Sequence, residues 1–329
     1  MRAAMLTEDH SFDVVDVPDP TPGAGELLLR VRACGICGSD LKTSTRFGAG
    51  SILGHEFCGE IAAIGPHVLG QWREGQLVAA MPLSSCGWCL WCLGGEPSHC
   101  EDVDLFGLGG TPGAFAEYIR VSAATAVALE PGMGDLGALV EPLAVGLHTV
   151  MEADLRLGDR VLVIGGGNVG AAVSTWARRL GSKEVLVSDP SASRRDRSGR
   201  FGATAVHDPA EGPPPSGFDI VFECVGVPGM VQAAIDAANV RGRVVIAGVC
   251  LEPDRILPIT AVTREVQLRF AVYYRPSEFR AAAALLGAGG IDGSAFVTSA
   301  VGLHGVNDAF ERLLSSTLAG KVLVTPAAD

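Results

Sequence analysis

A glycine-rich turn between an apolar strand and a helix constrains the fold of this chain more than any other feature. The segment "DRVLVIGGGNVGAAVSTWARRLG" predicts a buried strand at 161–164, followed by a helix that begins near Asn168 and has Trp176 and Leu180 on its apolar face. The turn has the pattern G-x-G-x-x-G, in which backbone N–H groups at the helix N-terminus can bind a pyrophosphate. The residues predicted to contact a dinucleotide here are Gly165, Gly167, Asn168, Val169 and Gly170.

The second predicted strand, "EVLVSD", ends at Asp189, about 20 residues beyond the turn. A carboxylate in that position accepts hydrogen bonds from the adenosine ribose and repels a 2′-phosphate, so it favours NAD over NADP. Arg194 and Arg195 follow closely, and a guanidinium there can accommodate the extra phosphate. We prefer NAD because of the carboxylate.

Further apolar segments alternate with segments of helical spacing such as "MVQAAIDAANV". Strands are expected at 218–226, 242–249 and 266–274, and "PAEGPPPSG" at 209–217 is expected to be a surface loop. This alternation predicts an α/β fold with a doubly wound parallel sheet. With 329 residues, of which 48% are hydrophobic, the chain is long enough for two domains.

Four cysteines are concentrated in the loop "CGWCLWCLGGEPSHC" at 86–100. Their pattern, C-x2-C-x2-C-x7-C, can close a tetrahedral zinc shell with no open position, which is a structural site. An iron–sulfur cluster also takes four thiolates, and free cysteines are the simplest alternative. The predicted ligands of the structural zinc are Cys86, Cys89, Cys92 and Cys100.

A second possible metal site is scattered along the chain. Cys37 lies in "ACGICGSD", His55 and Glu56 lie in "LGHEFCGE", and Glu141 lies in "ALVEPLAVGLH". A mixed sulfur, nitrogen and oxygen set can leave one position for water or substrate, which is typical of a catalytic zinc. Alternatively, Cys37 could form a redox pair with Cys34, and a single histidine is more often structural.

Composition narrows the partners and the compartment. The formal net charge is -12, and this acidic balance argues against nucleic acid as a partner, so we expect a small-molecule substrate. The first residues include Glu8, Asp9 and Asp13, and no stretch is long enough to span a membrane, so neither a signal peptide nor a membrane segment is expected. We therefore expect a cytoplasmic protein, in which nine cysteines suggest metal ligation rather than disulfides.

Taken together, the motifs resemble the zinc-dependent medium-chain alcohol dehydrogenase family, and within it the polyol, butanediol and threonine dehydrogenase branch. They are "CGICGSD", "GHE", the four-cysteine loop, "GAFAEY", "EPLAVGLH", "GGGNVG", "FECVG" and "AGKVLV". The resemblance implies a GroES-like β-barrel catalytic domain at 1–143, a Rossmann NAD-binding domain at 144–273 and a return to the catalytic domain at 274–329. It also implies an active site in the cleft between the domains.

The resemblance assigns roles at the metal site residue by residue. Cys37 and His55 match catalytic zinc ligands. Glu56 and Glu141 are both metal-site residues, because some relatives bind zinc through one carboxylate and hold a water with the other. We prefer Glu56 as the direct ligand. Two zinc ions per chain are therefore implied.

The proton path is also assigned by resemblance. Ser39 matches the hydroxyl that contacts the substrate oxygen and starts the relay, and Asp40 matches an acid that supports a ligand. Lys42 occupies the position where many relatives have the relay histidine.

One departure from the family concerns the cofactor phosphates. Gly38 stands where some members have an arginine that contacts the pyrophosphate. Lys321 and Arg194 are then the candidate basic contacts.

The implied activity is reversible hydride transfer between a secondary alcohol or polyol and NAD, in a homotetramer or else a dimer joined partly through "VQLRFAVYY". A dehydrogenase or reductase dedicated to a biosynthetic amino sugar, cyclitol or hydroxy amino acid fits the same pattern. A non-catalytic NAD-binding zinc protein is the alternative from another class.

Overall fold

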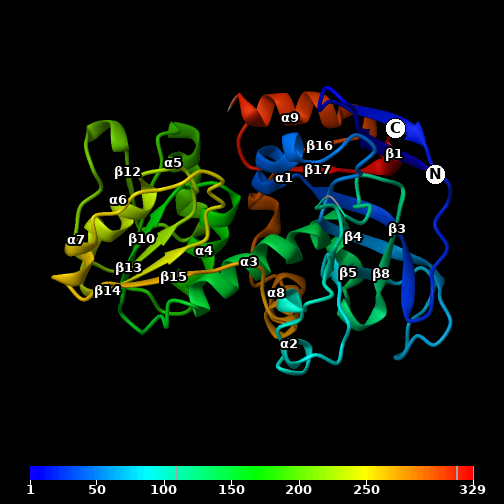
Figure 1. Cartoon of the computed structure of the whole chain (residues 1–329), viewed down its shortest axis with the longest axis horizontal. Coiled ribbons are helices and arrows are strands. Elements are labelled where there is room, and N and C mark those ends of the chain that lie inside the picture. The colour runs from blue at the N-terminus through cyan, green and yellow to red at the C-terminus, as the bar shows by residue number, and fades with distance from the viewer. Residues whose placement is uncertain (109, 316–317, 329) are drawn as a thin grey trace. The chain divides into compact units, whose positions relative to one another are not determined.

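The computed structural model describes residues 1–108, 110–315 and 318–328. The chain divides into two compact units (Figure 1). One unit comprises Met1–Glu141 and Arg275–Asp329, and the other comprises Pro142–Tyr274. The predicted domain boundaries followed residues 143 and 273, whereas the units divide after 141 and 274.

The first unit is built on a seven-stranded sheet in the described part of the chain, with the order β16-β17-β3-β4-β5-β9 and β8 paired to β3. Strands β16 and β17 come from the C-terminal segment, and β17 pairs antiparallel with β3, so the chain does return to this unit. Two further pairs, β1–β2 and β6–β7, form separate two-stranded sheets. The strands of the whole unit are β1 (Arg2–Leu6), β2 (Phe12–Asp16), β3 (Glu26–Gly35), β4 (Glu56–Ile64), β5 (Leu77–Ala80), β6 (Leu83–Ser84), β7 (Asp104–Leu105), β8 (Tyr118–Ser122), β9 (Ala126–Ala128), β16 (Val297–Val301) and β17 (Lys321–Val324). The α-helices are α1 (Gly38–Thr43), α2 (Leu90–Leu93), α8 (Pro276–Gly287) and α9 (Val306–Leu314).

Strand β3 shows why this sheet forms. Leu27, Leu29 and Val31 alternate with more exposed residues, so one face of the strand packs into the core. The last residues, Ala33–Gly35, are buried without alternation, so both faces of the strand are covered there. The end of β3 is therefore a fully enclosed part of the unit.

The second unit contains a six-stranded sheet of described residues, in the order β12-β11-β10-β13-β14-β15. Every pairing in it is parallel, which confirms the predicted doubly wound sheet. The strands are β10 (Arg160–Ile164), β11 (Glu184–Ser188), β12 (Ala205–His207), β13 (Phe218–Glu223), β14 (Ala238–Ile246) and β15 (Gln267–Phe270). The α-helices are α3 (Val140–Met151), whose first two residues belong to the first unit, α4 (Asn168–Arg179), α5 (Ala192–Ser198), α6 (Met230–Ala237) and α7 (Pro258–Val262).

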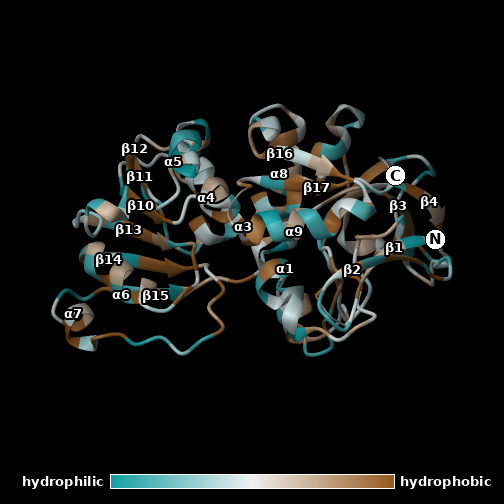
Figure 2. Ribbon diagram, turned by 90° about the horizontal axis from the view of Figure 1, so that it is seen from above, coloured by the Kyte–Doolittle hydropathy of each residue, from teal (hydrophilic) through white to brown (hydrophobic). Residues whose placement is uncertain are grey.

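Hydrophobic residues of the second unit are concentrated in its sheet, and polar residues on its surface helices (Figure 2). The strands of the second sheet are mostly brown, the colour of hydrophobic residues, whereas the surface helix α5 is largely teal. Continuous apolar strands are expected when helices cover both faces of a parallel sheet. None of the helices in the described ranges is long and apolar enough to cross a membrane.

Two local predictions for this unit were wrong. Trp176 is buried, as predicted, and its indole N–H donates to the carbonyl oxygen of Leu143 at 2.8 Å. Leu180, however, is 41% exposed, because α4 ends at Arg179 and Leu180 is its C-cap residue. The segment "MVQAAIDAANV" is helical only as far as Ala237, and its last residues belong to β14.

Candidate metal and cofactor sites

The four-cysteine lobe, residues 86–100, lies between β6 and β7. Its four thiols lie within 4.8 Å of one another. Gly87 and Gly95 both have φ of 81°, in the left-handed region that glycine adopts without strain, and they allow the chain to turn around the centre. Four converging thiolates fit a tetrahedral zinc ion, which these cysteines would hold.

Backbone N–H groups prepare these thiols for metal binding. The N–H of Cys89 donates to Sγ of Cys86 at 3.3 Å, and the N–H of Cys92 donates to Sγ of Cys89 at 3.5 Å. The latter bond, helped by the neighbouring thiols, lowers the pKa of Cys89 to about 7. The N–H of Cys86 lowers the pKa of Cys100, but burial and the adjacent thiols outweigh it and raise that pKa to about 11. All nine cysteines of the chain lie in described segments and are free thiols.

The mixed site consists of Cys37, His55 and Glu56, whose ligand atoms also lie within 4.8 Å of one another. Strand pairing brings them together, since β3 and β4 are antiparallel with Gly35 opposite Glu56. Cys37 follows the end of β3 and is the N-cap residue of α1. Sulfur, nitrogen and oxygen donors from three residues suit a zinc ion that keeps one position open.

Asp40 orients two members of this site. It is completely buried, and its Oδ1 lies 3.2 Å from Nδ1 of His55. Its Oδ2 accepts a hydrogen bond from the N–H of Cys37 at 2.9 Å. Burial lowers the pKa of His55, but the Asp40 carboxylate outweighs burial and raises the pKa well above its usual value. A carboxylate behind a ligating histidine fixes the ring orientation and leaves Nε2 for the metal.

Ser39 and Lys42 lie on α1 beside the site. Oγ of Ser39 is 3.3 Å from Nε2 of His55, so the hydroxyl borders the atom that would bind the metal. Lys42 lies in the last turn of the same short helix and is partly buried. The two predicted relay residues therefore share one helix with Asp40.

The two candidate carboxylates are placed differently. Glu56 belongs to the group of converging donors, whereas Glu141, in the first turn of α3, is buried but lies outside that group. Glu141 is nonetheless one of the acids that raise the pKa of Lys321. The geometry therefore favours Glu56 as the direct ligand and leaves Glu141 as a nearby negative charge.

Lys321, which was predicted to contact the cofactor phosphates, is engaged at the metal site. Its side chain is 1% exposed, its ammonium forms an ion pair with Oε2 of Glu56, and it donates to the carbonyl oxygen of Ile36 at 3.1 Å. Burial lowers the pKa of Lys321, but Glu56 and other acids outweigh it and raise the pKa. The ammonium is thus paired within the first unit, and its predicted contact with the pyrophosphate stays a prediction. The pairing was missed in the sequence, where a lysine heading the apolar strand "KVLV" was the available signal.

The glycine-rich turn has the geometry of a phosphate cradle. Gly165 has φ of 96°, and a Cβ on Gly170 would lie 1.8 Å from the carbonyl oxygen of Gly165. Gly167, the N-cap residue of α4, has no heavy atom within 4 Å of the place where a Cβ would stand. Asn168 and Val169 open the helix. The turn thus combines close packing on one side with free space at a helix N-terminus, which fits a dinucleotide pyrophosphate.

Asp189 lies directly after β11 and beside this turn. The N–H groups of Gly166 and Ser191 each donate to its carboxylate at 2.8 Å, and Nη1 of Arg194 lies 3.4 Å from it. The guanidinium of Arg195 pairs with the carboxylate of Asp208 at 2.7 Å and donates to the backbone carbonyl oxygen of Asp189 at 2.8 Å. Arg194 is therefore the arginine associated with the carboxylate that was predicted to select the cofactor.

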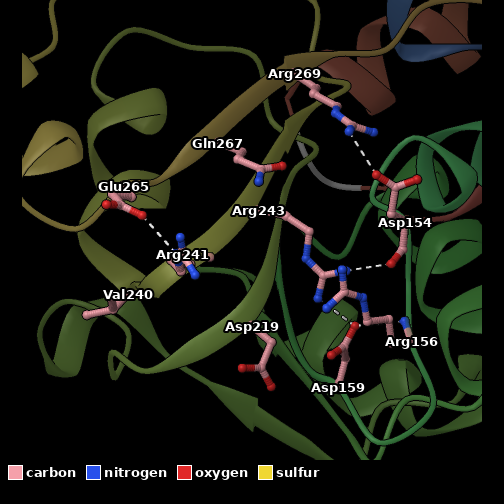
Figure 3. Close-up of a pocket in the computed structure, with 11 residues that line it drawn as sticks. Asp154, Arg156, Asp159, Asp219, Val240, Arg241, Arg243, Glu265, Gln267 and Arg269 are labelled. Carbon is pink, nitrogen blue, oxygen red and sulfur yellow. Dashed lines mark hydrogen bonds and ion pairs between the residues drawn. The ribbon is translucent and has the colours of Figure 1, made fainter.

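A charged cavity of about 730 Å³ lies in the second unit, near the amino ends of its strands and away from the glycine turn (Figure 3). Its guanidinium and carboxylate groups pair with one another: Arg243 with Asp159 at 2.7 Å, Arg269 with Asp154 at 2.8 Å and Arg241 with Glu265 at 2.8 Å. The two charges within each pair neutralise each other, so these three arginines are already engaged and do not form a phosphate site for the cofactor.

Comparisons with known proteins agree with this geometry. Residues 23–131 match the alcohol dehydrogenase GroES-like domain, and residues 168–288 match the zinc-binding dehydrogenase family. The 2-dehydro-3-deoxy-L-galactonate 5-dehydrogenase of Pseudoalteromonas atlantica is 34% identical, with 98% of each chain covered. The sorbitol dehydrogenase of Bacillus subtilis is 28% identical over 95% of this chain and 94% of its own.

Among solved structures, a zinc-binding dehydrogenase of Sinorhizobium meliloti bound to NADP has a TM-score of 0.88 and 31% identity, with 99% of each chain covered. The chain belongs to the zinc-dependent medium-chain dehydrogenase family. The predicted fold class, the oxidoreductase class and the need for zinc and a nicotinamide dinucleotide are confirmed.

Proposed function

We propose that this protein is an NAD-dependent zinc dehydrogenase that oxidises a secondary alcohol or polyol and, in reverse, reduces the corresponding ketone. The carrying observation is that Cys37, His55 and Glu56 converge while the hydroxyl of Ser39 lies 3.3 Å from His55. Zinc, when bound, polarises a substrate oxygen and makes its proton more acidic.

The residues of this chain divide the remaining work. Asp40 holds His55 and the N–H of Cys37, which fixes two donor atoms before metal or substrate binds. Ser39 is positioned to accept the proton of the substrate hydroxyl and pass it towards solvent, and Lys42 is the nearest basic residue on the same helix. The glycine turn and α4 would hold the dinucleotide that takes the hydride.

The substrate class can be tested with a panel of polyols, 2,3-diols, threonine, cyclic alcohols and sugar acids, each scanned for NADH formation. The relative named for 2-dehydro-3-deoxy-L-galactonate supports a second candidate, an enzyme dedicated to one carbohydrate-derived intermediate. Turnover of many polyols supports the first candidate, and turnover of one compound supports the second. Protein that binds zinc and NADH but turns over nothing contradicts both and favours a non-catalytic role.

The preference for NAD over NADP rests on Asp189, which is fully buried beside the glycine turn. A negative charge there disfavours a 2′-phosphate. Arg194 and the relative solved with NADP define the competing outcome. Steady-state kinetics with both cofactors decide between them, and a higher kcat/KM for NADP contradicts the assignment.

Self-association through the second sheet is also part of the proposal. Strand β15 forms one edge of that sheet, and Phe270 on it is 71% exposed. An exposed apolar edge strand favours pairing with another chain, so we propose a tetramer or else a dimer. Light scattering that returns a monomer contradicts this. We also propose a cytoplasmic location, where the nine thiols would stay reduced.

A further inference from the structure

The buried ammonium of Lys321 requires an explanation that the family assignment does not supply. Lysine is almost never fully buried unless it is paired, because removing its charge from water is costly. Lys321 is 1% exposed, and so is its partner Glu56. The pair lies at the metal site itself, since Glu56 is one of its three converging donors.

Three neighbouring strands create this pair. In the sheet, Gly35 of β3 lies between Leu323 of β17 and Glu56 of β4. Lys321 is two residues before Leu323, so its side chain is on the same face as Glu56. The two side chains meet across the position of Gly35.

Gly35 keeps this space open. A Cβ built on Gly35 would lie 2.1 Å from Oε2 of Glu56 and 3.0 Å from Cδ of Lys321. A larger residue would therefore require the carboxylate of Glu56 to move from its present position. Glycine serves here for close approach and not for an unusual backbone conformation, and it leaves room for the two paired side chains.

The pair limits what Glu56 can offer to a metal. Because the ammonium of Lys321 holds Oε2, Oε1 is the oxygen of Glu56 outside the ion pair, and this arrangement favours zinc binding through that one oxygen. The same ammonium holds the carbonyl oxygen of Ile36, the residue before Cys37. The ammonium of Lys321 thus restrains two parts of the metal site: the backbone just before Cys37 and the carboxylate of Glu56.

We propose that Lys321 is a positioning residue of the metal site, which competes with zinc for the Glu56 carboxylate and so keeps one coordination position open for substrate. This inference rests on the proposed function, since it concerns the same site. Without the ammonium, both oxygens of Glu56 are available to the metal, and the positive charge of Lys321 no longer repels the metal cation. The metal is then held more tightly and the open position is closed.

The test uses full-length protein that keeps zinc in the four-cysteine lobe and carries Co(II) at the mixed site. In Lys321→Met we expect chelator to remove Co(II) ~10-fold or more slowly than in the parent, the size typical of changes to groups behind metal ligands. We also expect the visible absorption of Co(II) to weaken in this variant, because the coordination number of the metal rises when both oxygens of Glu56 bind. Lys321→Arg, which keeps the charge, should restore both properties. Affinity for NADH should stay within about twofold if the ammonium serves Glu56 and not the pyrophosphate.

Several outcomes would overturn the inference. A tenfold weaker affinity for NADH with unchanged Co(II) retention would return Lys321 to the pyrophosphate. In a Glu56→Gln background, Lys321→Met should no longer slow the removal of Co(II). If it slows removal as much as in the parent, Lys321 does not act through Glu56. If the methionine variant does not fold, Lys321→Gln replaces it, because its amide can still donate to Ile36. None of these measurements needs turnover, so the inference can stand even if no substrate is found.

Discussion

The two predicted metal sites lie in the same unit but are built in opposite ways. The four-cysteine lobe is local in sequence and poorly buried: Trp88, Leu90 and Leu93 are 71%, 89% and 73% exposed. The mixed site is assembled from distant segments, and His55, Glu56 and Lys321 are 5%, 1% and 1% exposed. The lobe has almost no apolar core of its own and would depend on its metal to stay folded. At the mixed site, the protein core holds the donors in place before any metal arrives.

This difference separates stability from catalysis. A closed shell of four thiolates leaves no position for substrate, whereas the mixed site keeps its donors inside a rigid sheet with polar partners behind them. Damage to the lobe should therefore appear first as loss of structure. Damage to the mixed site should appear first as loss of turnover.

The largest effect is expected for Cys37→Ser. Removing this ligand should lower kcat/KM by roughly 10³-fold or more, because zinc at the mixed site supplies the main activation of the substrate oxygen. Thermal unfolding should stay close to that of the parent, since the surrounding strands are packed independently of the thiol. Steady-state kinetics and elemental analysis, which should fall from two zinc ions per chain towards one, check the expectation.

The matched control is Cys89→Ser in the lobe. It should also remove one zinc ion, but it should lower the thermal midpoint by roughly 5 °C or more and reduce turnover only through loss of folded protein. Equal behaviour of the two variants would erase the distinction between the sites. Iron in place of zinc in the parent would mean that the lobe was misread.

A smaller effect is expected for Ser39→Ala. It should lower kcat by roughly 10²-fold, because a positioned proton acceptor contributes about that much and water replaces it only in part. Lys42→Ala should lower kcat by less, since solvent can bypass a residue at the end of the helix. An equal, large loss in both variants would show that Lys42 is an essential relay member. The kcat values at saturating substrate and cofactor provide the measurement.

The two metal sites also differ in how much of each could be predicted from the sequence. The lobe was predictable because its ligands are close in sequence, and the structure adds only the N–H···S bonds around them. Cys37, His55 and Glu56 were found from motifs, yet their convergence depends on the β3–β4 register, which a motif does not contain. Lys321 was given another role for the same reason: its partner is set by a sheet that joins the two ends of the first unit.

Cofactor residues show the same limit. Gly165 and Gly170 could be assigned because the strand, turn and helix are consecutive in the sequence. The burial of Asp189 depends on where β12 lies. That Arg194, and not Arg195, lies beside its carboxylate depends on where Asp208 lies, since Asp208 pairs with Arg195. Local chemistry was therefore predictable, and the pairing of charges across the fold was not.

A further prediction concerns the metal-free lobe. The pKa of Cys89 is lowered to about 7, whereas that of Cys100 is raised to about 11. These pKa values depend on the N–H···S bonds of the folded lobe. If the lobe keeps those bonds when zinc is removed, Cys89 should be alkylated ~10-fold faster than Cys100 at neutral pH, because only the thiolate reacts. If the lobe unfolds without its metal, the two rates should be similar. In the folded lobe, labelling of Cys89 should fall as the pH drops below about 7. Mass spectrometry of protein treated with iodoacetamide gives the rates, zinc should protect both residues, and faster labelling of Cys100 would contradict the assigned thiolate.

The smallest effect is expected at the cofactor site, away from both metals. Asp189→Ser should shift the ratio of kcat/KM for NAD over NADP by ~10-fold towards NADP, because the charge that repels a 2′-phosphate is lost while Arg194 remains beside it. Asp189→Asn is the matched control, since its amide can still accept the N–H of Gly166 and so separates charge from support of the turn. If both variants shift the ratio equally, charge decides the preference. If only the serine variant does so, the carboxylate acts by holding the turn in place. Adding Arg194→Ala to either variant should cancel the gain for NADP, and a gain that persists would mean that another cation, not Arg194, receives the phosphate.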